Sequence, residues 1–272
     1  MPTNEQRREA AKRKLERQLE RRAQKARQRK QLTIAGSVVG VVVLVAGIAL
    51  VYVLTKGSDD KAAAIPSIVS PATGCAYPPS QQPPAREVAP PSTDGEETTE
   101  VVTASIETAQ GPIGLTLDNV KSPCTVNSFL SLASQGFFDN TTCHRLVDSP
   151  TAKLLQCGDP TGTGTGSPGY QFNDEYPVPK NEGEFAKGDL YKRGVVAMAN
   201  SGAGTNTNGS QFFLVFGDSQ FPPDYTIFGT IDEPGLATLD KIGAGGIVPG
   251  PGGAADGKPV LPADITSVTV DY

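Results

Sequence analysis

A loop rich in glycine and asparagine lies between two short apolar runs in the C-terminal half of this 272-residue chain. The runs, Val195–Met198 and Phe212–Phe216, have the length and composition of β-strands. Glycine allows the loop positive φ, and the side-chain amides of Asn200 and Gln211 both donate and accept hydrogen bonds. Phe213 adds an apolar wall next to them. These residue types suit a site that binds a peptide backbone together with an apolar ring.

Two more motifs precede this loop. They are Cys143–Arg145 (Cys-His-Arg) and Gln156–Asp159 (Gln-Cys-Gly-Asp), and the loop itself supplies a third, Met198–Phe213. With these motifs in this order, the chain resembles the cyclophilin family of peptidyl-prolyl cis/trans isomerases over roughly Val101–Asp271. The run at 156–164 and the N-terminal apolar segment make it most similar to the membrane-anchored actinobacterial subgroup. The resemblance implies an isomerase that acts on proline-containing polypeptides without a cofactor.

The resemblance also implies a mainly β fold, a closed eight-stranded antiparallel barrel capped by two helices. The sequence pattern agrees, because short alternating runs recur between turn signals. Ser122 is expected as the N-cap of one helix, with Pro123 in its first turn and Gly136 at its end. The predicted helices cover 122–136 and 236–242. The predicted strands lie at 101–108, 113–117, 141–147, 153–157, 194–198, 211–216, 226–231 and 263–270.

The chemistry of such an isomerase depends on a well-placed donor. Rotation about an X-Pro bond meets a barrier of roughly 20 kcal/mol, which comes from resonance between the nitrogen lone pair and the carbonyl. No covalent bond changes, so the catalyst need only bind the twisted amide more tightly than the planar forms. Arginine suits this task because it stays protonated and presents a fixed fork of donors. The resemblance assigns this catalytic role to Arg145.

The resemblance further implies a set of substrate-binding residues around Arg145. Gln156 and the backbone at Asn200 are expected to hold the substrate backbone. Phe213 and Leu154 are expected to form the floor and wall of the proline pocket. The full predicted set is Leu154, Gln156, Ala199, Asn200, Gln211, Phe213, Phe221 and Tyr225.

The chain departs from the family pattern at this pocket. The aromatic residue that usually stands three positions before the glutamine is Lys153, and the turn at 148–152 is longer than the common form. The family's tryptophan is replaced by Phe221, which Pro222-Pro223 follow, and its histidine aligns with Tyr225. Because phenylalanine has no indole N–H to donate to cyclosporin, we expect only weak cyclosporin binding.

Other functions have weaker support. His144 is the only histidine and lacks a serine or cysteine nucleophile in a recognisable setting, so we interpret it as structural. Gly164–Gly169 matches GxGxxG, but Pro168 stands where a helix would begin, which indicates a surface loop. One histidine and no CxxC pair predict no metal site, and charge alone does not predict nucleic-acid binding. Two alternatives remain: a tethered proline-peptide binding module with little or no turnover, and a chain whose basic N-terminal segment is the functional part.

Charge and hydropathy divide the chain into four parts. Residues 1–31 hold 12 Lys and Arg against four Asp and Glu, a net +8, whereas the remainder has a net charge of −13. The 23 uncharged residues 32–54 suit one transmembrane helix and exceed the apolar region of a cleaved signal peptide. Basic residues favour the cytoplasmic side, so we expect a single-pass cell-membrane protein with residues 1–31 inside and the domain at 100–272 outside. Proline-rich residues 55–99 predict a linker.

All four cysteines, Cys75, Cys124, Cys143 and Cys157, lie on the predicted outer side. An even number of cysteines in an oxidising compartment favours at least one disulfide. Three pairings are possible, and the sequence does not choose among them. Cys143 and Cys157 flank a predicted hairpin, but the two-residue period of a strand places them on opposite faces unless a bulge intervenes.

Overall fold

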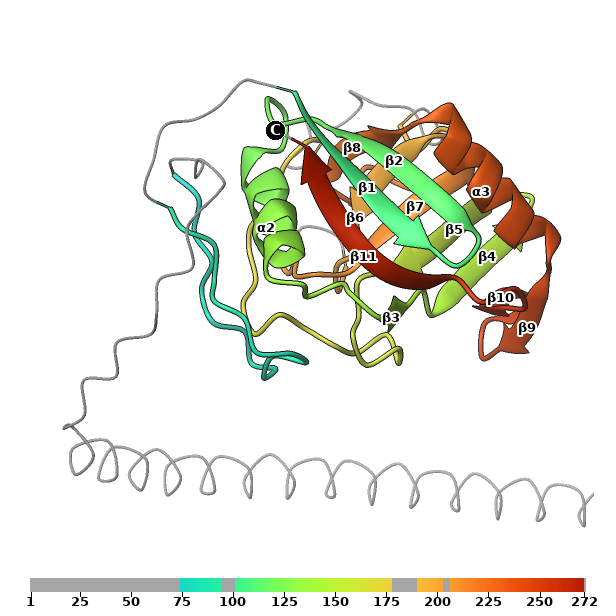
Figure 1. Cartoon of the computed structure of the whole chain (residues 1–272), viewed down its shortest axis with the longest axis horizontal. Coiled ribbons are helices and arrows are strands. Elements are labelled where there is room, and N and C mark those ends of the chain that lie inside the picture. Colours follow the sequence, from blue (N-terminus) through green and yellow to red (C-terminus); the bar gives the residue numbers. More distant parts are fainter. Residues whose placement is uncertain (1–73, 94–100, 178–189, 203–205, 272) are drawn as a thin grey trace, which may run out of the picture. The chain divides into compact units, whose positions relative to one another are not determined.

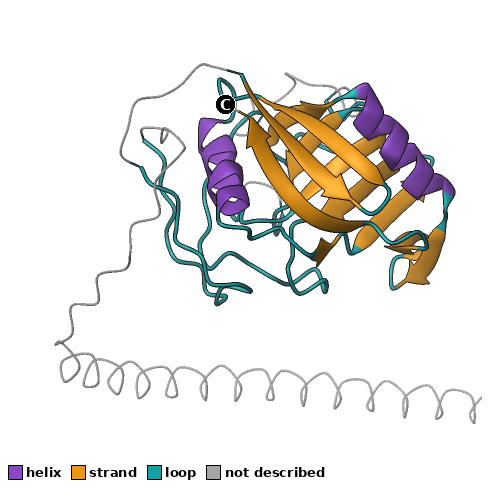
Figure 2. Ribbon diagram, in the orientation of Figure 1, coloured by secondary structure: helices purple, strands orange, loops and turns teal. Residues whose placement is uncertain are grey.

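A computed structural model describes residues 74–93, 101–177, 190–202 and 206–271. Within these ranges, eleven strands form one antiparallel sheet in the order β3-β11-β1-β2-β8-β6-β7-β5-β4-β10-β9. Figures 1 and 2 show this sheet curled, with α2 near β11 and α3 near β2. The strands are β1 (Val102–Thr108), β2 (Gly111–Leu117), β3 (Thr141–Thr142), β4 (Arg145–Ser149), β5 (Ala152–Cys157), β6 (Val195–Met198), β7 (Phe212–Gly217), β8 (Ile227–Ile231), β9 (Ile247–Gly250), β10 (Gly253–Pro259) and β11 (Asp264–Asp271). The helices are α2 (Pro123–Ser134) and α3 (Glu233–Ala244).

The prediction of a closed eight-stranded barrel is wrong. Across the described ranges the sheet has eleven strands, and its order runs from an edge at β3 to an edge at β9. One additional strand arises because the segment at 141–147 forms two strands, interrupted at Cys143 and His144. The other two strands are the β9–β10 hairpin. Its many glycines and prolines are depleted from strands in general, so the sequence pattern predicts no strand there.

The predicted basic segment at 1–31 and the predicted transmembrane helix at 32–54 lie outside the described residues. Contacts divide the chain into two units, Met1–Ala64 and Ile65–Tyr272, and every described residue belongs to the second. Neither of the two described helices is long and apolar enough to cross a membrane. The membrane-spanning part of the fold prediction therefore has no counterpart in the described structure.

Residues 74–93, called the arm below, fall within the predicted linker but pack on the domain. A disulfide joins Cys75 of the arm to Cys124 in the first turn of α2. The ring of Tyr77 is buried in the main core. Farther along, Arg86 Nη1 donates hydrogen bonds to the main-chain carbonyls of Gly136, Phe137 and Asp139, in the segment after α2. The arm is therefore a fixed part of the folded unit.

The N-terminus of α2 is capped by a residue from elsewhere in the chain. Ser122 occupies the N-cap position as predicted, but its hydroxyl donates to the Ile227 carbonyl at 2.6 Å and makes no cap hydrogen bond. Instead, the Glu175 carboxylate accepts from the backbone N–H groups of Cys124 and Thr125 at 3.0 and 2.8 Å. A carboxylate at this end of a helix also interacts favourably with the helix dipole.

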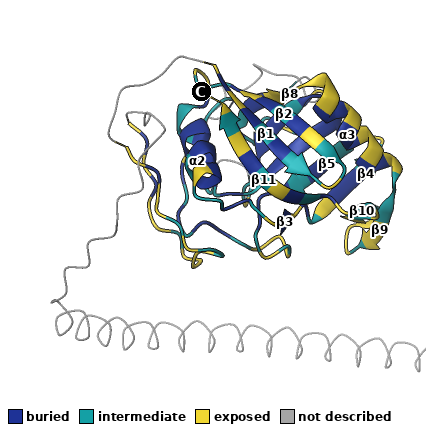
Figure 3. Cartoon of the chain, in the orientation of Figure 1, coloured by how far each residue is buried: buried dark blue, intermediate teal, exposed yellow. Residues whose placement is uncertain are grey.

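The sheet separates two apolar clusters. Along β7, Phe212 and Leu214 face the main core, whereas Phe213 and Val215 belong to a second, smaller cluster. This alternation follows from the two-residue period of a strand. Figure 3 shows buried residues along the strands, with the exposed residues of α3 on its outer side. The second cluster forms the apolar floor of the candidate site.

Candidate active site

A row of side chains crosses four neighbouring strands on one face of the sheet. Arg145 of β4 is paired with Gln156 of β5, and Gln156 with Phe213 of β7. Phe213 is in turn paired with Ala197 of β6. Directly opposed residues on adjacent strands lie close enough for their side chains to interact. The register therefore places a cation, an amide and an aromatic ring next to one another.

The Arg145 guanidinium is held by two partners. Its Nε and Nη2 donate to the Oδ1 and Oδ2 atoms of Asp256 at 2.8 and 2.7 Å, a bidentate ion pair. Its Nη1 donates to Gln156 Oε1 at 3.2 Å. The hydrogen bonds from Arg145 hold the pKa of the Asp256 carboxyl below its ordinary value. The Arg145 side chain nevertheless keeps 46% of its surface exposed, so a ligand can still reach it.

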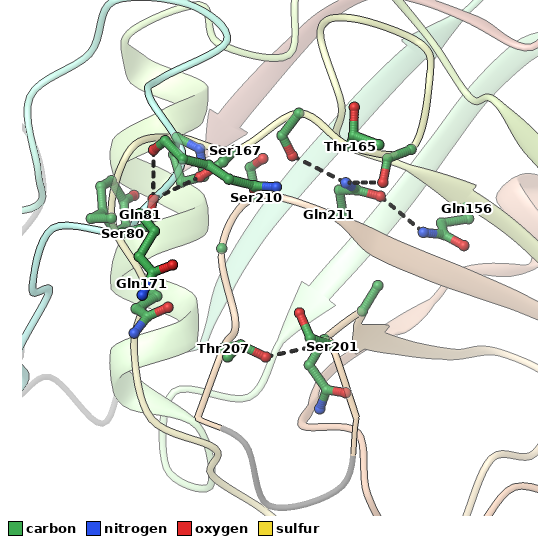
Figure 4. Close-up of a pocket in the computed structure, with 18 residues that line it drawn as sticks. Ser80, Gln81, Gln156, Thr165, Ser167, Gln171, Ser201, Thr207, Ser210 and Gln211 are labelled. Carbon is green, nitrogen blue, oxygen red and sulfur yellow. Dashed lines mark hydrogen bonds between the residues drawn. The ribbon is translucent and has the colours of Figure 1, made fainter. Parts of the chain in front are cut away.

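Two glutamines extend this arrangement into a longer polar chain. Gln156 Nε2 donates to Gln211 Oε1 at 2.9 Å, and Gln211 Nε2 donates to the carbonyls of Gly164 and Gly166 at 3.0 and 3.1 Å (Figure 4). Each amide oxygen faces a donor and each amide nitrogen faces an acceptor, so the network fixes the orientation of both amides. A chain of hydrogen bonds therefore runs from Arg145 to the carbonyls of the loop at 159–166.

That loop is organised around the buried carboxylate of Asp159. Its oxygens accept from the N–H groups of Thr161, Thr163 and Gly164 at 2.7, 3.2 and 2.7 Å. Burial alone would raise the pKa of Asp159, but the hydrogen bonds from Gly166, Thr161 and Gly164 outweigh it and lower the pKa. A Cβ at Gly166 would lie 1.9 Å from Asp159 Oδ1, which is why this position requires glycine.

An aromatic cluster forms the apolar part of the site. The rings of Phe213, Phe221 and Tyr225 meet edge to face, with centroids 5.4 to 5.9 Å apart. Tyr191 is fully buried beneath them, and its hydroxyl donates to the Tyr225 carbonyl at 2.8 Å while accepting from the Tyr225 N–H at 2.9 Å. Burial raises the pKa of the Tyr191 hydroxyl. Leu154 packs in the same cluster.

The loop before β7 places the remaining predicted residues. Asn200 Nδ2 donates to the Asp224 carbonyl at 2.8 Å, and Asn200 Oδ1 accepts from the Gly202 N–H at 3.0 Å. Its side chain therefore fixes the loop against the segment that carries Phe221. The Ala199 N–H donates to the Gln211 carbonyl at 2.9 Å.

The predicted site residues fall into two adjoining groups, which meet where Gln156 of β5 is paired with Phe213 of β7. Arg145 joins the first group through its hydrogen bond to Gln156. A polar pocket is lined by Gln156, Ala199, Asn200 and Gln211. The second apolar cluster or its margin holds Leu154, Phe213, Phe221, Tyr225 and Ala199. The structure thus brings the set together, and the role of each residue stays a prediction.

Two residues at the site were not predicted from the sequence. Asp256 lies on β10, the strand that the pattern did not reveal, and only the pairing of β10 with β4 brings it to Arg145. Tyr191 precedes Gly194 in a stretch without strand periodicity. Its aromatic side chain is the one feature of the sequence that could have pointed to it. Lys153, which aligns with a family aromatic, points away from the cluster, because its neighbour Leu154 packs in the cluster and successive side chains of a strand face opposite sides. Its ammonium lies over the Phe216 ring and pairs with Asp148.

The two cysteines next to the site are paired with each other, and the structural role of His144 stays a prediction. Cys143 and Cys157 form a disulfide, which is possible because the break between β3 and β4 releases Cys143 from the strand alternation. Burial lowers the pKa of His144, and its Nδ1 has no hydrogen-bond partner in the described part of the chain. No group of three or more His, Cys, Asp and Glu that could hold a metal gathers in the described ranges.

Comparison with known proteins identifies this arrangement. Residues 103–270 match the family of cyclophilin type peptidyl-prolyl cis-trans isomerase/CLD proteins. A Mycobacterium leprae protein described as a probable peptidyl-prolyl cis-trans isomerase B is 49% identical over an alignment of 305 positions, gaps included, which covers 100% of both chains. A Mycobacterium tuberculosis protein of the same description is 53% identical over 201 residues, 72% of this chain and 64% of that one.

A solved structure shows the same fold. The cyclophilin type isomerase of Cryptosporidium parvum, in the presence of the dipeptide Ala-Pro, matches with a TM-score of 0.50 at 30% identity. The match covers 62% of this chain and 99% of that chain. The chain therefore belongs to the cyclophilin-type peptidyl-prolyl cis-trans isomerase family.

Proposed function

We propose that this isomerase acts on secreted or cell-envelope proteins outside the cytoplasmic membrane, with Arg145 as its catalytic residue. The observation that carries the catalytic assignment is the row of Arg145, Gln156 and Phe213 across three strands. A fixed cation, an amide and an apolar surface lie next to one another in this row, and we expect one X-Pro unit to contact all three. The Ala-Pro dipeptide of the Cryptosporidium structure supports such a ligand.

The hydrogen bonds of Arg145 suit it to bind a twisted amide. Asp256 and Gln156 accept three of the five guanidinium N–H groups, which leaves one on Nη1 and one on Nη2 for a substrate. As the X-Pro bond twists, its nitrogen becomes pyramidal and its lone pair becomes an acceptor. A charge-assisted hydrogen bond to that lone pair is worth about 1.5–3 kcal/mol. That corresponds to roughly 10- to 150-fold in rate.

The aromatic cluster contributes by holding the proline ring. Phe213, Phe221 and Tyr225 offer an apolar surface with no charge, and burial of a side chain of this size stabilises binding by about 1.5–3 kcal/mol. Gln156 holds the Arg145 fork in place and has its own amide orientation fixed by Gln211. The groups are thus oriented before the substrate binds, which avoids reorganisation in the transition state.

The extracytoplasmic location is supported by the cysteines and by the charge pattern. All four cysteines are in disulfides, Cys75 with Cys124 and Cys143 with Cys157, and disulfides persist in oxidising compartments. The basic segment at 1–31 and the apolar segment at 32–54 favour retention at the membrane with the domain outside. Proteins that fold there, secreted or in the envelope, are the proposed substrates.

One experiment distinguishes catalysis from the alternative of a binding module. Exchange NMR on a short Ala-Pro-containing peptide, with the full-length chain added in catalytic amount, measures cis/trans interconversion directly. The proposal predicts accelerated exchange. Peptide binding without acceleration would favour the binding module. For location, protease added to intact cells stripped of their wall should digest the domain, and a domain that is shielded until the membrane is permeabilised would contradict the assignment.

A further inference from the structure

The arm is fixed to the domain along its whole described length. Beyond the Cys75–Cys124 disulfide, its backbone pairs with the segment that follows the loop at 159–166. The Ser80 N–H donates to the Gly169 carbonyl at 2.9 Å, and the Ala85 N–H donates to the Ser167 carbonyl at 2.8 Å. These two anchors hold the bend between them in a defined position.

This bend lies at the edge of a pocket of about 620 Å³. Figure 4 shows Ser80 and Gln81 on one side of the pocket and Gln156 and Gln211 on the opposite side. Gln82 is also part of the lining. The pocket is therefore built jointly by the arm and by the glutamine chain that ends at Arg145. A volume of this size suits more than one side chain of a ligand.

The residues that line the pocket are polar or apolar and uncharged. Its lining side chains supply amides and hydroxyls, and none of them is an Asp, Glu, Lys, Arg or His. A charged group that enters such a site loses hydration without gaining a counter-charge, which is costly. A neutral group that both donates and accepts hydrogen bonds finds matching partners on every side. The lining therefore favours neutral polar ligands over charged ones.

The arm lies outside the region of the chain that is matched to the family. The family match covers 103–270, and residues 80–82 lie outside it. The pocket shares Gln156 and Gln211 with the catalytic arrangement, so a ligand in it lies next to the residues that hold Arg145.

We propose that the arm is part of the substrate-binding site. Its bend at Ser80–Gln82 completes a subsite beside the proline groove, and this subsite binds a neutral polar stretch of the substrate and selects against charged residues there. The inference rests on the isomerase function proposed above, because the subsite is defined by its position next to a bound X-Pro unit.

The test uses the full-length chain and a family of proline-containing peptides. In each peptide, one of the three positions on either side of the proline is Ala, Gln, Glu or Lys. Peptide-observed exchange NMR gives kcat/KM, and titration of the same samples gives Kd. The wild type should prefer Gln over both Glu and Lys at one position, with no such preference at the others.

A charge placed in the subsite makes the test specific. Gln82→Glu should raise the preference for Lys over Glu about 2- to 5-fold at that same position, the size expected for an exposed charge pair. Ala89→Glu is the matched control, because it adds the same charge to an exposed arm position outside the pocket. The mass of both variants after thiol alkylation should show that the Cys75–Cys124 disulfide is intact, so that the arm is still attached to the domain.

The outcomes separate the two proposals. The subsite would be overturned if Gln82→Glu changed the preference for Lys over Glu equally at all peptide positions. It would also be overturned if Ala89→Glu changed this preference as much, or if Gln82→Glu changed it in neither kcat/KM nor Kd. If the wild type accelerates exchange of no peptide, the isomerase function fails instead, and the Kd values for the same peptides still decide whether the subsite exists.

Discussion

The carboxylate of Asp256 holds the guanidinium of Arg145 in a bidentate pair, with Nε–Oδ1 and Nη2–Oδ2 distances of 2.8 and 2.7 Å. The pair joins two strands, β10 and β4, that are more than a hundred residues apart in sequence order. Because two parallel hydrogen bonds fix the plane of the guanidinium, they also fix the direction of its remaining N–H groups. We therefore regard Asp256 as a positioning residue for Arg145.

Asp256→Ala should lower kcat/KM by about tenfold, a loss of roughly 1.4 kcal/mol of transition-state stabilisation. Most of the loss should be in kcat, because the proline ring is held by other residues. The kcat/KM of Asp256→Asn should lie between those of the wild type and Asp256→Ala, since the amide oxygen can still accept one hydrogen bond. The matched control is Asp240→Asn, which disrupts a similar bidentate pair with Arg193 away from the site. If the Asp256 and Asp240 variants have equal activity, the positioning role is contradicted.

The buried carboxylate of Asp159 should make the loop at 159–166 sensitive to acid. Its pKa is lowered in the folded protein, so its contribution to the free energy of unfolding is fully present above the ordinary aspartate pKa of about 3.9. The contribution is lost as the pH falls through the lowered folded-state value. Asp159→Asn should therefore destabilise the domain at pH 7 by about 1–3 kcal/mol and reduce the acid dependence. Denaturant unfolding at several pH values checks this, and equal loss of stability at pH 7 and pH 2 would count against it.

The two disulfides should contribute unequally to stability. Loop entropy gives about 4 kcal/mol for closing the longer loop and about 3 kcal/mol for the shorter one. Their sequence separations are 49 residues for Cys75–Cys124 and 14 for Cys143–Cys157. Serine pairs at each disulfide, compared by denaturant unfolding, measure the difference. Loss of Cys75–Cys124 should also weaken the selectivity of the arm subsite, whereas full selectivity without it would show that the arm needs no tether.

Cyclosporin should inhibit this enzyme weakly. Phe221 packs edge to face on Phe213 and Tyr191, so the apolar contact is kept, but it supplies no N–H donor. An unpaired acceptor on the drug costs about 1–3 kcal/mol, or roughly 5- to 150-fold in affinity. Phe221→Trp should therefore tighten the inhibitor more than it changes turnover, although Pro222-Pro223 limit how the new ring can be placed. Inhibitor titration of both forms checks this, and tight inhibition of the wild type would rule out the role given to Phe221.

The parts of the structure that sequence predicts best are those set by short-range patterns. Strands β1, β2 and β5–β8 and helix α2 lie close to their predicted ranges, because strand alternation, Pro123 and Gly136 are local signals. The row of Arg145, Gln156 and Phe213 follows from motifs that the family shares. Their register in the sheet then brings these residues together.

The missed features depend on contacts between distant segments. The Asp256 strand is rich in glycine and proline and pairs with β4 only in the folded sheet. Lys153, at the position of a family aromatic, lies on the opposite face of β5 from Leu154, with its ammonium over the Phe216 ring. The arm has the composition of a linker, and its order comes from Tyr77 burial and the Cys75 disulfide rather than from any periodic pattern.

The most direct test of the account is the activity of Arg145→Ala in the full-length chain. Exchange NMR on an Ala-Pro peptide should show at least a tenfold lower kcat/KM, about 1.4 kcal/mol or more. Circular dichroism and peptide Kd should stay close to the wild-type values, because the aromatic cluster still holds the proline. Unchanged kcat/KM in a folded variant would contradict the assignment of Arg145 as the catalytic residue.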